Sequence, residues 1–256
     1  MQGQLTGAPC VAMVGSRACS VYGRNVATRL AEDLARAGIT VVSGLARGID
    51  AAAHRGCLDA GGMTIAVLPG GLCPVYPRRH RALARRVAAC GALVAEHEPG
   101  TEVARWHFPK RNRIMAGLAW ATVVVEAAAR SGARITANLA LEYGREVLVV
   151  PGPITSATSA GCHALLADGA HPCTGVADIL DHLPVTVTAK LRPSTPTDLD
   201  SPSRALLELL RRRGRLGASK VAELLGWSLM DTLTTITGLE VRGLVRILPG
   251  NRIESC

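Results

Sequence analysis

Small residues and arginines follow the apolar segments of this 256-residue chain at several separate places. Gly15, Ser16 and Arg17 follow one such segment, and the run Ser43-Gly44-Leu45-Ala46-Arg47-Gly48 begins at the end of the next. Small residues let a backbone approach a phosphate closely, hydroxyl groups donate hydrogen bonds to its oxygens, and a guanidinium group pairs with its charge. These residue types in this pattern favour anion binding.

Two further segments combine cations with small or hydroxyl-bearing residues. Their residues are Lys110, Arg111, Asn112 and Arg113, which open a predicted helix, and Arg130, Ser131, Gly132 and Thr136, which follow another apolar segment. One such segment alone is usually a turn, whereas several together indicate a common anion-binding face. We expect five guanidinium groups to converge on one groove, those of Arg17, Arg47, Arg111, Arg113 and Arg130.

Six short apolar segments are predicted to be the strands that position these residues. They are rich in β-branched residues and apolar on both faces, as strands buried in a parallel sheet are. The segments are Val11–Val14, Thr40–Ser43, Thr64–Leu68, Ala92–Ala95, Thr122–Val125 and Val147–Val150. Amphipathic stretches such as 23–37 and 135–143 lie between them. This alternation predicts an α/β fold with a doubly wound, mostly parallel, Rossmann-like sheet, whose ligands bind beyond the carboxyl ends of the strands.

The chain is predicted to divide into two domains joined by a linker. Residues 1–183 hold the sheet, residues 184–203 carry four prolines and no apolar periodicity, and residues 204–256 form a small C-terminal domain. That domain is predicted to contain helices at 203–213, 219–225 and 228–241, followed by two strands around Pro249-Gly250-Asn251. Three helices followed by a hairpin are the element order of a winged helix.

The composition favours an anionic partner such as nucleic acid. The chain carries 29 basic and 20 acidic residues, a net charge of +9, and all but three of the cations are arginines. Eight cysteines without C-x-x-C spacing favour free thiols over a metal site. Because the sequence shows neither a signal peptide nor a run of about 18 apolar residues, we expect a cytoplasmic protein without a membrane partner.

The strand ends lack the motifs of cofactor-dependent and hydrolytic enzymes. Gly15-Ser16-Arg17 is not G-x-G-x-x-G, and Ser43 stands where an acid would bind a ribose hydroxyl. The sequence contains neither a P-loop nor a nucleophile elbow, and no histidine has a metal-ligand partner at i+4. His54, four residues after Asp50, favours a structural hydrogen bond over catalysis. We therefore expect no cofactor, no metal and no enzymatic activity.

The order of these motifs resembles the DNA-processing protein A (DprA/Smf) family. The resemblance covers about residues 10–180 and rests above all on the octapeptide Ser43–Asp50 and the hexapeptide Phe108–Arg113. Tyr76-Pro77 and Arg130-Ser131-Gly132 fall in the same order as in the family. The C-terminal domain is also similar to the small winged helix that many members carry.

The resemblance implies a cytoplasmic, non-enzymatic protein that binds single-stranded DNA during natural transformation. It further implies that the protein protects incoming strands, forms a homodimer and loads the RecA recombinase. In the family's DNA pocket, the matching residues are Arg17, Arg130, Ser43–Gly48 and Arg111–Arg113. Because aromatic residues make up only 3% of the chain, we expect binding through the DNA backbone with little base stacking.

Two other function classes are weighed against this interpretation. The first is a phosphoribohydrolase of the lysine-decarboxylase-like Rossmann family, whose motif is Pro-Gly-Gly-x-Gly-Thr-x-x-Glu. If Gly132 is aligned with the last glycine of that motif, Thr136 stands at the position of the catalytic glutamate. This substitution disfavours hydrolysis. The second is a transcription regulator that reads duplex DNA through its winged helix. Its expected recognition helix, 228–241, carries Asp231 in its N-terminal turn and has no basic residue, so we favour an accessory or protein-interaction role.

Overall fold

The computed structural model describes residues 1–4, 7–184, 200–241, 244–248 and 252–255. The chain divides into two units, Met1–Arg192 and Pro193–Cys256, which are described separately below.

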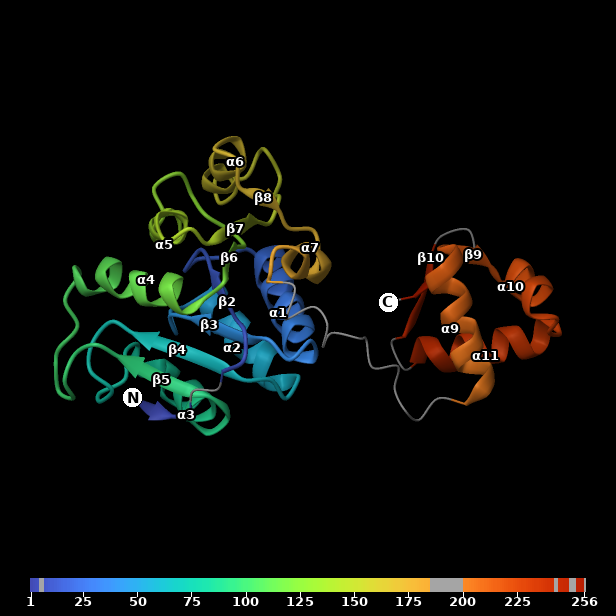
Figure 1. The fold of residues 1–256 in the computed structure, drawn as a ribbon, viewed down its shortest axis with the longest axis horizontal. Helices are drawn as coiled ribbons and strands as arrows, with labels where there is room; N and C mark the ends of the chain where they lie inside the picture. The colour runs from blue at the N-terminus through green and yellow to red at the C-terminus, as the bar shows by residue number, and fades with distance from the viewer. Residues whose placement is uncertain (5–6, 185–199, 242–243, 249–251, 256) are drawn as a thin grey trace. The chain divides into compact units, whose positions relative to one another are not determined.

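An eight-stranded sheet forms the centre of the first unit (Figure 1). Its strands are β1 (Gln2–Gly3), β2 (Cys10–Val14), β3 (Thr40–Ser43), β4 (Thr64–Leu68), β5 (Ala92–Ala95), β6 (Ala121–Val124), β7 (Glu146–Val149) and β8 (His171–Pro172). They lie in the order β1-β5-β4-β3-β2-β6-β7-β8, and β1 alone is antiparallel to its neighbour in this sheet. The predicted α/β fold with a mostly parallel sheet is confirmed, and each predicted strand agrees with the observed one to within one residue.

Helices cover both faces of this sheet. One face carries α1 (Val21–Arg36), α2 (Ile49–Asp59), α3 (Arg81–Cys90) and α7 (Val176–Asp181), and the other carries α4 (His107–Leu118), α5 (Gly132–Glu142) and α6 (Ala160–Ala167). A short 3₁₀ helix, η1 (Arg78–His80), precedes α3. Side chains of β2 alternate between the two cores, with Val11 and Met13 on one face and Ala12 and Val14 on the other. Burial on both faces explains why the strands are continuous apolar runs.

Capping residues set where two of these helices begin. The hydroxyl of Ser20 accepts a hydrogen bond from the backbone N–H of Gly23 at 3.0 Å, and that of Ser131 accepts one from Ala133 at 3.2 Å. Each satisfies a backbone donor that has no partner within its helix. As a result α1 and α5 begin before the starts predicted at residues 23 and 135.

The chain reverses its progress across the sheet between β2 and β6. From β2 it proceeds outward through β3, β4 and β5, and β6 then returns to the other side of β2. The loops that follow β2 and β6 therefore begin side by side at the carboxyl edge of the sheet. In open α/β sheets this reversal is where ligands bind.

The second unit contains three helices and a small antiparallel sheet. Its elements are α9 (Ser201–Arg213), β9 (Leu216–Gly217), α10 (Ala218–Leu225), α11 (Leu229–Val241), β10 (Val245–Leu248) and β11 (Arg252–Ser255), with strand order β10-β11-β9. Leu206, Leu210, Ile236 and Leu239 form the centre of its core. The winged-helix assignment stays a prediction.

The predicted linker at 184–203 falls largely on residues 185–199, which lie outside the described residues. Its C-terminal limit is corrected by the structure, because α9 already begins at Ser201. The Asp200 carboxylate accepts a hydrogen bond from the Ser203 N–H at 3.1 Å, and a proline stands in the first turn. Both features start a helix rather than extend a linker. Across the described residues, no helix is long and apolar enough to span a bilayer.

His54 of α2 is a buried structural residue. Its Nδ1 lies 2.7 Å from the Thr64 hydroxyl, which itself donates to the Val41 carbonyl oxygen at 2.7 Å. The hydroxyl therefore accepts from Nδ1–H, and Nε2 stays unprotonated without a described partner. The expected structural hydrogen bond is present, with Thr64 as the partner. Burial, reinforced by the charge of Arg111, lowers the pKa of His54 from 6.5 to about 3.

This lowered pKa predicts acid sensitivity that depends on one residue. Below pH 6.5 the unfolded chain binds a proton at His54 that the folded chain does not bind until about pH 3. The free energy of unfolding should therefore fall as the pH falls through this interval, by up to about 1.4 kcal/mol per pH unit from this group. Urea unfolding at several pH values should show a shallower pH dependence for His54→Gln than for the wild type. Equal dependence in both proteins would contradict this account.

Candidate nucleic-acid interface

Two loops at the carboxyl edge of the sheet pack backbone against backbone. The N–H of Ile49 donates to the carbonyl oxygen of Ser16 at 3.2 Å. Gly48 has a φ of +76°, and a Cβ atom there would overlap the same carbonyl group. Glycine is therefore needed at Gly48 both for its backbone conformation and for the close approach of the loops. The packing places Arg17 and Arg47 on adjoining loops, and both side chains are exposed.

The buried carboxylate of Asp50 holds the second loop in place. Its Oδ2 accepts hydrogen bonds from the backbone N–H groups of Gly44 at 3.1 Å and Ala46 at 3.2 Å. The carbonyl oxygen of Leu45 lies 2.8 Å from Nδ1 of the buried His80 ring. Burial raises the pKa of Asp50, while the charge of Arg111 and the two N–H donors oppose the rise. The loop is thus supported from within the protein.

Arg111 lies beneath this loop and not on the surface. Its side chain donates to the carbonyl oxygen of Val67, and the residue is only 5% exposed. The guanidinium group lies so close to Gly44 that a Cβ atom there would overlap it. Burial lowers the pKa of Arg111 to about 10, and the charge of Asp50 opposes this effect. The expected convergence of Arg111 on an exposed groove is therefore wrong, because its charge is compensated inside the protein.

The other residues of the α4 segment point to different surroundings. Arg113 forms an ion pair with Glu96, and the amide of the buried Asn112 donates to the carbonyl oxygen of Gly132 at 3.3 Å. Lys110 is exposed, with its ammonium 5.8 Å from the centroid of the Trp106 ring. Successive residues of a helix are about 100° apart, so a run of basic residues cannot form one continuous surface.

Two hydroxyl groups that were expected to contact an anion are buried. Ser43 is 0% exposed and donates to the carbonyl oxygen of Met13 at 2.6 Å, which joins β3 to β2. Thr136 is 1% exposed and donates to the carbonyl oxygen of Gly132 within α5 at 3.4 Å. Both serve the fold, and neither is available to a ligand. Arg130 remains exposed in the loop that precedes α5.

The carboxylate of Glu126 fills the crevice where the strand order reverses. It accepts hydrogen bonds from the Ser20 N–H at 2.9 Å and from the Ser20 hydroxyl at 2.5 Å. Gly23 has no side chain, which leaves room for the Glu126 carboxylate. Glu126 is 4% exposed. In dinucleotide-binding folds the N-terminus of this helix binds the pyrophosphate. Here a carboxylate of the protein occupies that place. Glu126 was given no role on the basis of the sequence. Its position directly after a predicted buried strand was, however, an indication that it lies at the carboxyl edge of the sheet.

An open cavity of about 540 Å³ lies on one side of Arg17 and Arg47. The loops, the adjoining parts of α1 and α2, and η1 line it. Its lining includes five arginines, which are Arg17, Arg24, Arg47, Arg55 and Arg79. We call this cavity the arginine groove.

The arginines of this groove have no carboxylate partners within the described parts of the chain. Each of the five is exposed, and none forms an ion pair with another described residue. The acid in the lining, Asp59, is paired with Arg86 at 2.5 Å. Arg24, Arg55 and Arg79 were not predicted from the sequence, because they follow no strand end. For Arg55 helical spacing was an indication, since Ala51, Ala52 and Arg55 share one side of α2.

A smaller pocket of about 50 Å³ lies on the other side of the same two arginines. Besides Arg17 and Arg47, it is lined by Gly44, Ala46, Pro69, Tyr76, Pro77 and Phe108. The guanidinium carbon of Arg17 lies 4.6 Å from the centroid of the Phe108 ring, which meets Tyr76 edge-on at 5.7 Å. We call this the aromatic pocket. Its rings can stabilise a cation or a planar group, and the adjoining groove can bind phosphates.

Residues 1–184 match the family model of DNA recombination-mediator protein A. The chain is 44% identical over 243 residues to DNA processing protein DprA of Mycobacterium tuberculosis strain H37Rv, a match that covers 93% of this chain and 62% of that protein. The chain thus spans less than two thirds of the length of this relative.

Two solved structures are similar to this fold. DNA processing protein A from Streptococcus pneumoniae is 41% identical with a TM-score of 0.66, over 69% of this chain and 62% of that one. DNA processing protein A from Helicobacter pylori, described for its single-stranded DNA binding mode, is 26% identical with a TM-score of 0.64, over 72% of this chain and 82% of that one. The sequence match and the shared fold agree, and the chain belongs to the DNA recombination-mediator protein A family.

Proposed function

We propose that this protein binds single-stranded DNA along the arginine groove and the aromatic pocket and does not act as an enzyme on it. The observation that carries this proposal is the set of five exposed arginines around one cavity without a free carboxylate in its lining. Guanidinium groups left without counter-charges favour a polyanion, whose phosphates replace small counterions. The single-stranded DNA binding described for the relative from H. pylori supports the same ligand.

The shape of the groove favours a single strand over a duplex. Duplex DNA is stiff over about 150 base pairs and carries its phosphates on a wide cylinder. A single strand can bend locally and follow the groove between α1 and α2. Because the chain has seven aromatic residues, and Phe108 and Tyr76 line the pocket, we expect few stacked bases and weak sequence selectivity.

The proposal divides the residues expected from the sequence into two groups. Arg17 and Arg47 are proposed to contact the DNA, joined by Arg24, Arg55 and Arg79 of the groove. Further DNA contacts are proposed for two exposed cations that are not part of the groove, Lys110 and Arg130, and for the backbone of residues 15–16 and 44–48. Ser43, Arg111, Asn112 and Thr136 are assigned to the support of the fold, and Ser131 and Gly132 to the start of α5.

The wider role proposed for the protein follows the family. We propose that it acts in the cytoplasm during natural transformation, as a homodimer that protects incoming strands and loads RecA onto them. The C-terminal unit is proposed to be a winged helix with an accessory role. The first turn of its helix α11 contains Asp231, whose carboxylate accepts a hydrogen bond from the Ser228 hydroxyl at 2.6 Å. An acid in this turn disfavours contact with duplex phosphates.

The first prediction concerns the salt dependence of DNA binding. If about four phosphates are neutralised, binding should weaken roughly 50-fold between about 50 and about 200 mM salt, a log–log slope of about −2.8. Arg55→Ala or Arg47→Ala should lower affinity and flatten the slope by about 0.7, because one phosphate contact is lost. Fluorescence anisotropy of a labelled oligothymidine over a salt series measures both quantities.

Arg29→Ala is the matched control for these variants. Arg29 is an exposed arginine of α1 that does not line the groove, so its loss should leave the slope unchanged. Equal slopes for the groove variants and the wild type would overturn the proposed path of the DNA.

The second prediction separates Arg111 from the groove arginines. Arg111→Ala removes the cation with the larger effect on the buried Asp50 carboxylate and should lower the free energy of unfolding by about 3 kcal/mol. The salt slope of the folded variant should match the wild type. Urea unfolding and the same anisotropy series test this pair of outcomes. A flattened slope with unchanged stability would place Arg111 on the DNA instead.

The third prediction tests the non-enzymatic interpretation against the phosphoribohydrolase alternative. The residue that would be the catalytic glutamate of such an enzyme is Thr136, which is buried and bonded within its helix. Incubation with nucleoside monophosphates should therefore release no free base, as measured by chromatography. Robust turnover that survives in Arg55→Ala would refute the binding-protein proposal.

A further inference from the structure

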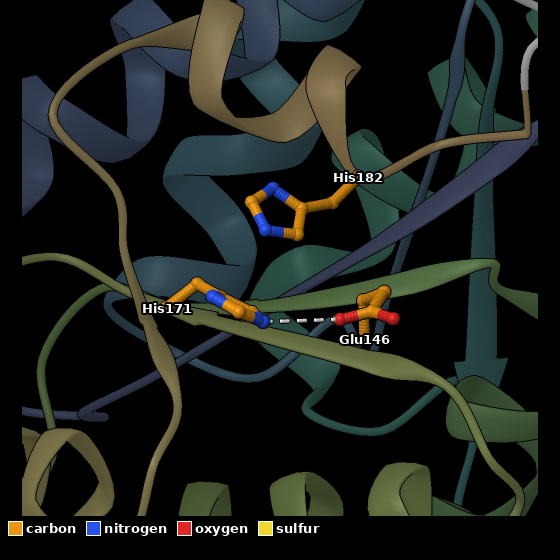
Figure 2. Close-up of side chains that lie close together, drawn as sticks. All are labelled: Glu146, His171 and His182. Atoms are coloured by element: carbon orange, nitrogen blue, oxygen red, sulfur yellow. Dashed lines mark ion pairs between the residues drawn. The ribbon is translucent and has the colours of Figure 1, made fainter.

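Three potential metal ligands meet at the β8 edge of the sheet (Figure 2). Glu146 begins β7, His171 begins the neighbouring β8, and His182 follows the last turn of α7. Their ligand atoms all lie within 4.8 Å of one another, and all three side chains are accessible. No other group of this kind occurs among the described residues. None of the three lines the arginine groove or the aromatic pocket.

The spacing of these groups approaches that of a tetrahedral site. Zinc binds imidazole nitrogen and carboxylate oxygen at about 2.0–2.2 Å, which separates two tetrahedral ligand atoms by about 3.4 Å. His171 Nε2 lies 3.4 Å from Glu146 Oε2, so this pair already has that separation. The His182 ring lies beside the His171 ring, with centroids 4.1 Å apart. The ligand atoms lie within 4.8 Å of one another, so metal binding requires them to move closer, and the exposed His171 ring can rotate to allow this.

The backbone of α7 prepares His182 for this role. Its Nδ1 lies 2.8 Å from the carbonyl oxygen of Asp178, and because a carbonyl oxygen only accepts, Nδ1 carries the hydrogen. The lone pair of Nε2 is then free. Metal-binding histidines commonly donate their other ring N–H to a carbonyl oxygen in this way, which fixes the tautomer and the orientation of the ring.

The turn between β8 and α7 fixes the spacing of the two histidines. The Asp178 carboxylate accepts hydrogen bonds from the N–H and hydroxyl of Thr174 at 2.6 and 2.8 Å and from the N–H of Gly175 at 3.2 Å. These bonds fix the conformation of the turn between β8 and α7. Cys173 in the same turn is 1% exposed, and its thiol donates to the carbonyl oxygen of Gly175 at 3.6 Å, so it is not a competing ligand.

We propose that Glu146, His171 and His182 bind one divalent transition-metal ion, with zinc as the favoured ion and water completing its coordination. Two neutral imidazoles and one carboxylate suit zinc and its neighbours better than magnesium or calcium, which prefer oxygen ligands. The ion would join β7, β8 and α7, and its proposed role is to stabilise this edge of the sheet. This proposal revises the sequence-based expectation of no metal, since that expectation rested on local spacing.

Cobalt binding tests this proposal directly. The full chain is treated with a chelator, freed of it, and titrated with Co²⁺, whose tetrahedral complexes absorb visible light. We expect one equivalent of cobalt to bind with visible bands but without the near-ultraviolet band of a thiolate ligand, and zinc to displace it. Absence of saturable binding at one equivalent, or a thiolate band, would overturn the proposal.

Three variants identify the ligands. His182→Ala and the isosteric Glu146→Gln should each weaken cobalt binding more than about tenfold. His97→Ala is the matched control. The His97 ring also stacks on another histidine, His107, with the ring centroids 4.2 Å apart, but among the described residues it belongs to no three-ligand group. Zinc should raise the melting temperature of the wild type and of His97→Ala, and not that of the other two variants. Unchanged affinity in both ligand variants would refute the site. DNA affinity is not part of this test, so its outcome is independent of the proposed function.

Discussion

The hydrogen bonds from Gly44 and Ala46 to the buried Asp50 carboxylate are the interaction on which the proposed interface depends. The loop after β3 leaves the sheet, so its backbone N–H groups need an acceptor outside the sheet. Oδ2 of the Asp50 carboxylate accepts from two of these groups. Burying that charge is unfavourable unless a cation lies near it, and Arg111 supplies this cation from α4. Because the support lies inside, the exposed Arg47 does not hold the loop and is available for a ligand.

The two kinds of arginine in this structure follow from the dielectric of their surroundings. Inside the protein, Arg111 needs the nearby negative charge of Asp50, since an isolated buried charge would be too costly. At the surface, water and salt screen the repulsion among Arg17, Arg24, Arg47, Arg55 and Arg79. The fold can therefore keep five cations around one cavity without neutralising them. Such an arrangement costs little in stability and remains attractive to a polyanion.

The strands of the sheet were predicted from the sequence, because they depend on local patterns. Apolar runs located the strands, and Arg17 and Arg47 were found as cations among small residues at strand ends. Arg111 was misplaced, because a basic run on a helix divides between the interior and the surface. Arg24 and Arg55 were missed because the groove brings together two helices that follow different strands. The ligands Glu146, His171 and His182 were missed for a similar reason, since strand pairing and the turn into α7 create their proximity.

Glu126 distinguishes this chain from nucleotide-binding proteins of similar fold and agrees with the proposed binding of a polyanion. In such folds the N-terminus of the first helix attracts a pyrophosphate, because its N–H groups have no other partner. In this chain Glu126 accepts from Ser20, and the Ser20 hydroxyl in turn accepts from Gly23, so the helix start is both satisfied and negatively charged. A phosphate at that crevice would meet a carboxylate. The positive charge lies instead around the side of α1 and α2, where the cavity is open and a long, flexible strand can pass through it. The position of one buried acid thus disfavours nucleotide binding at the helix start and is consistent with the polyanion binding proposed for the neighbouring groove.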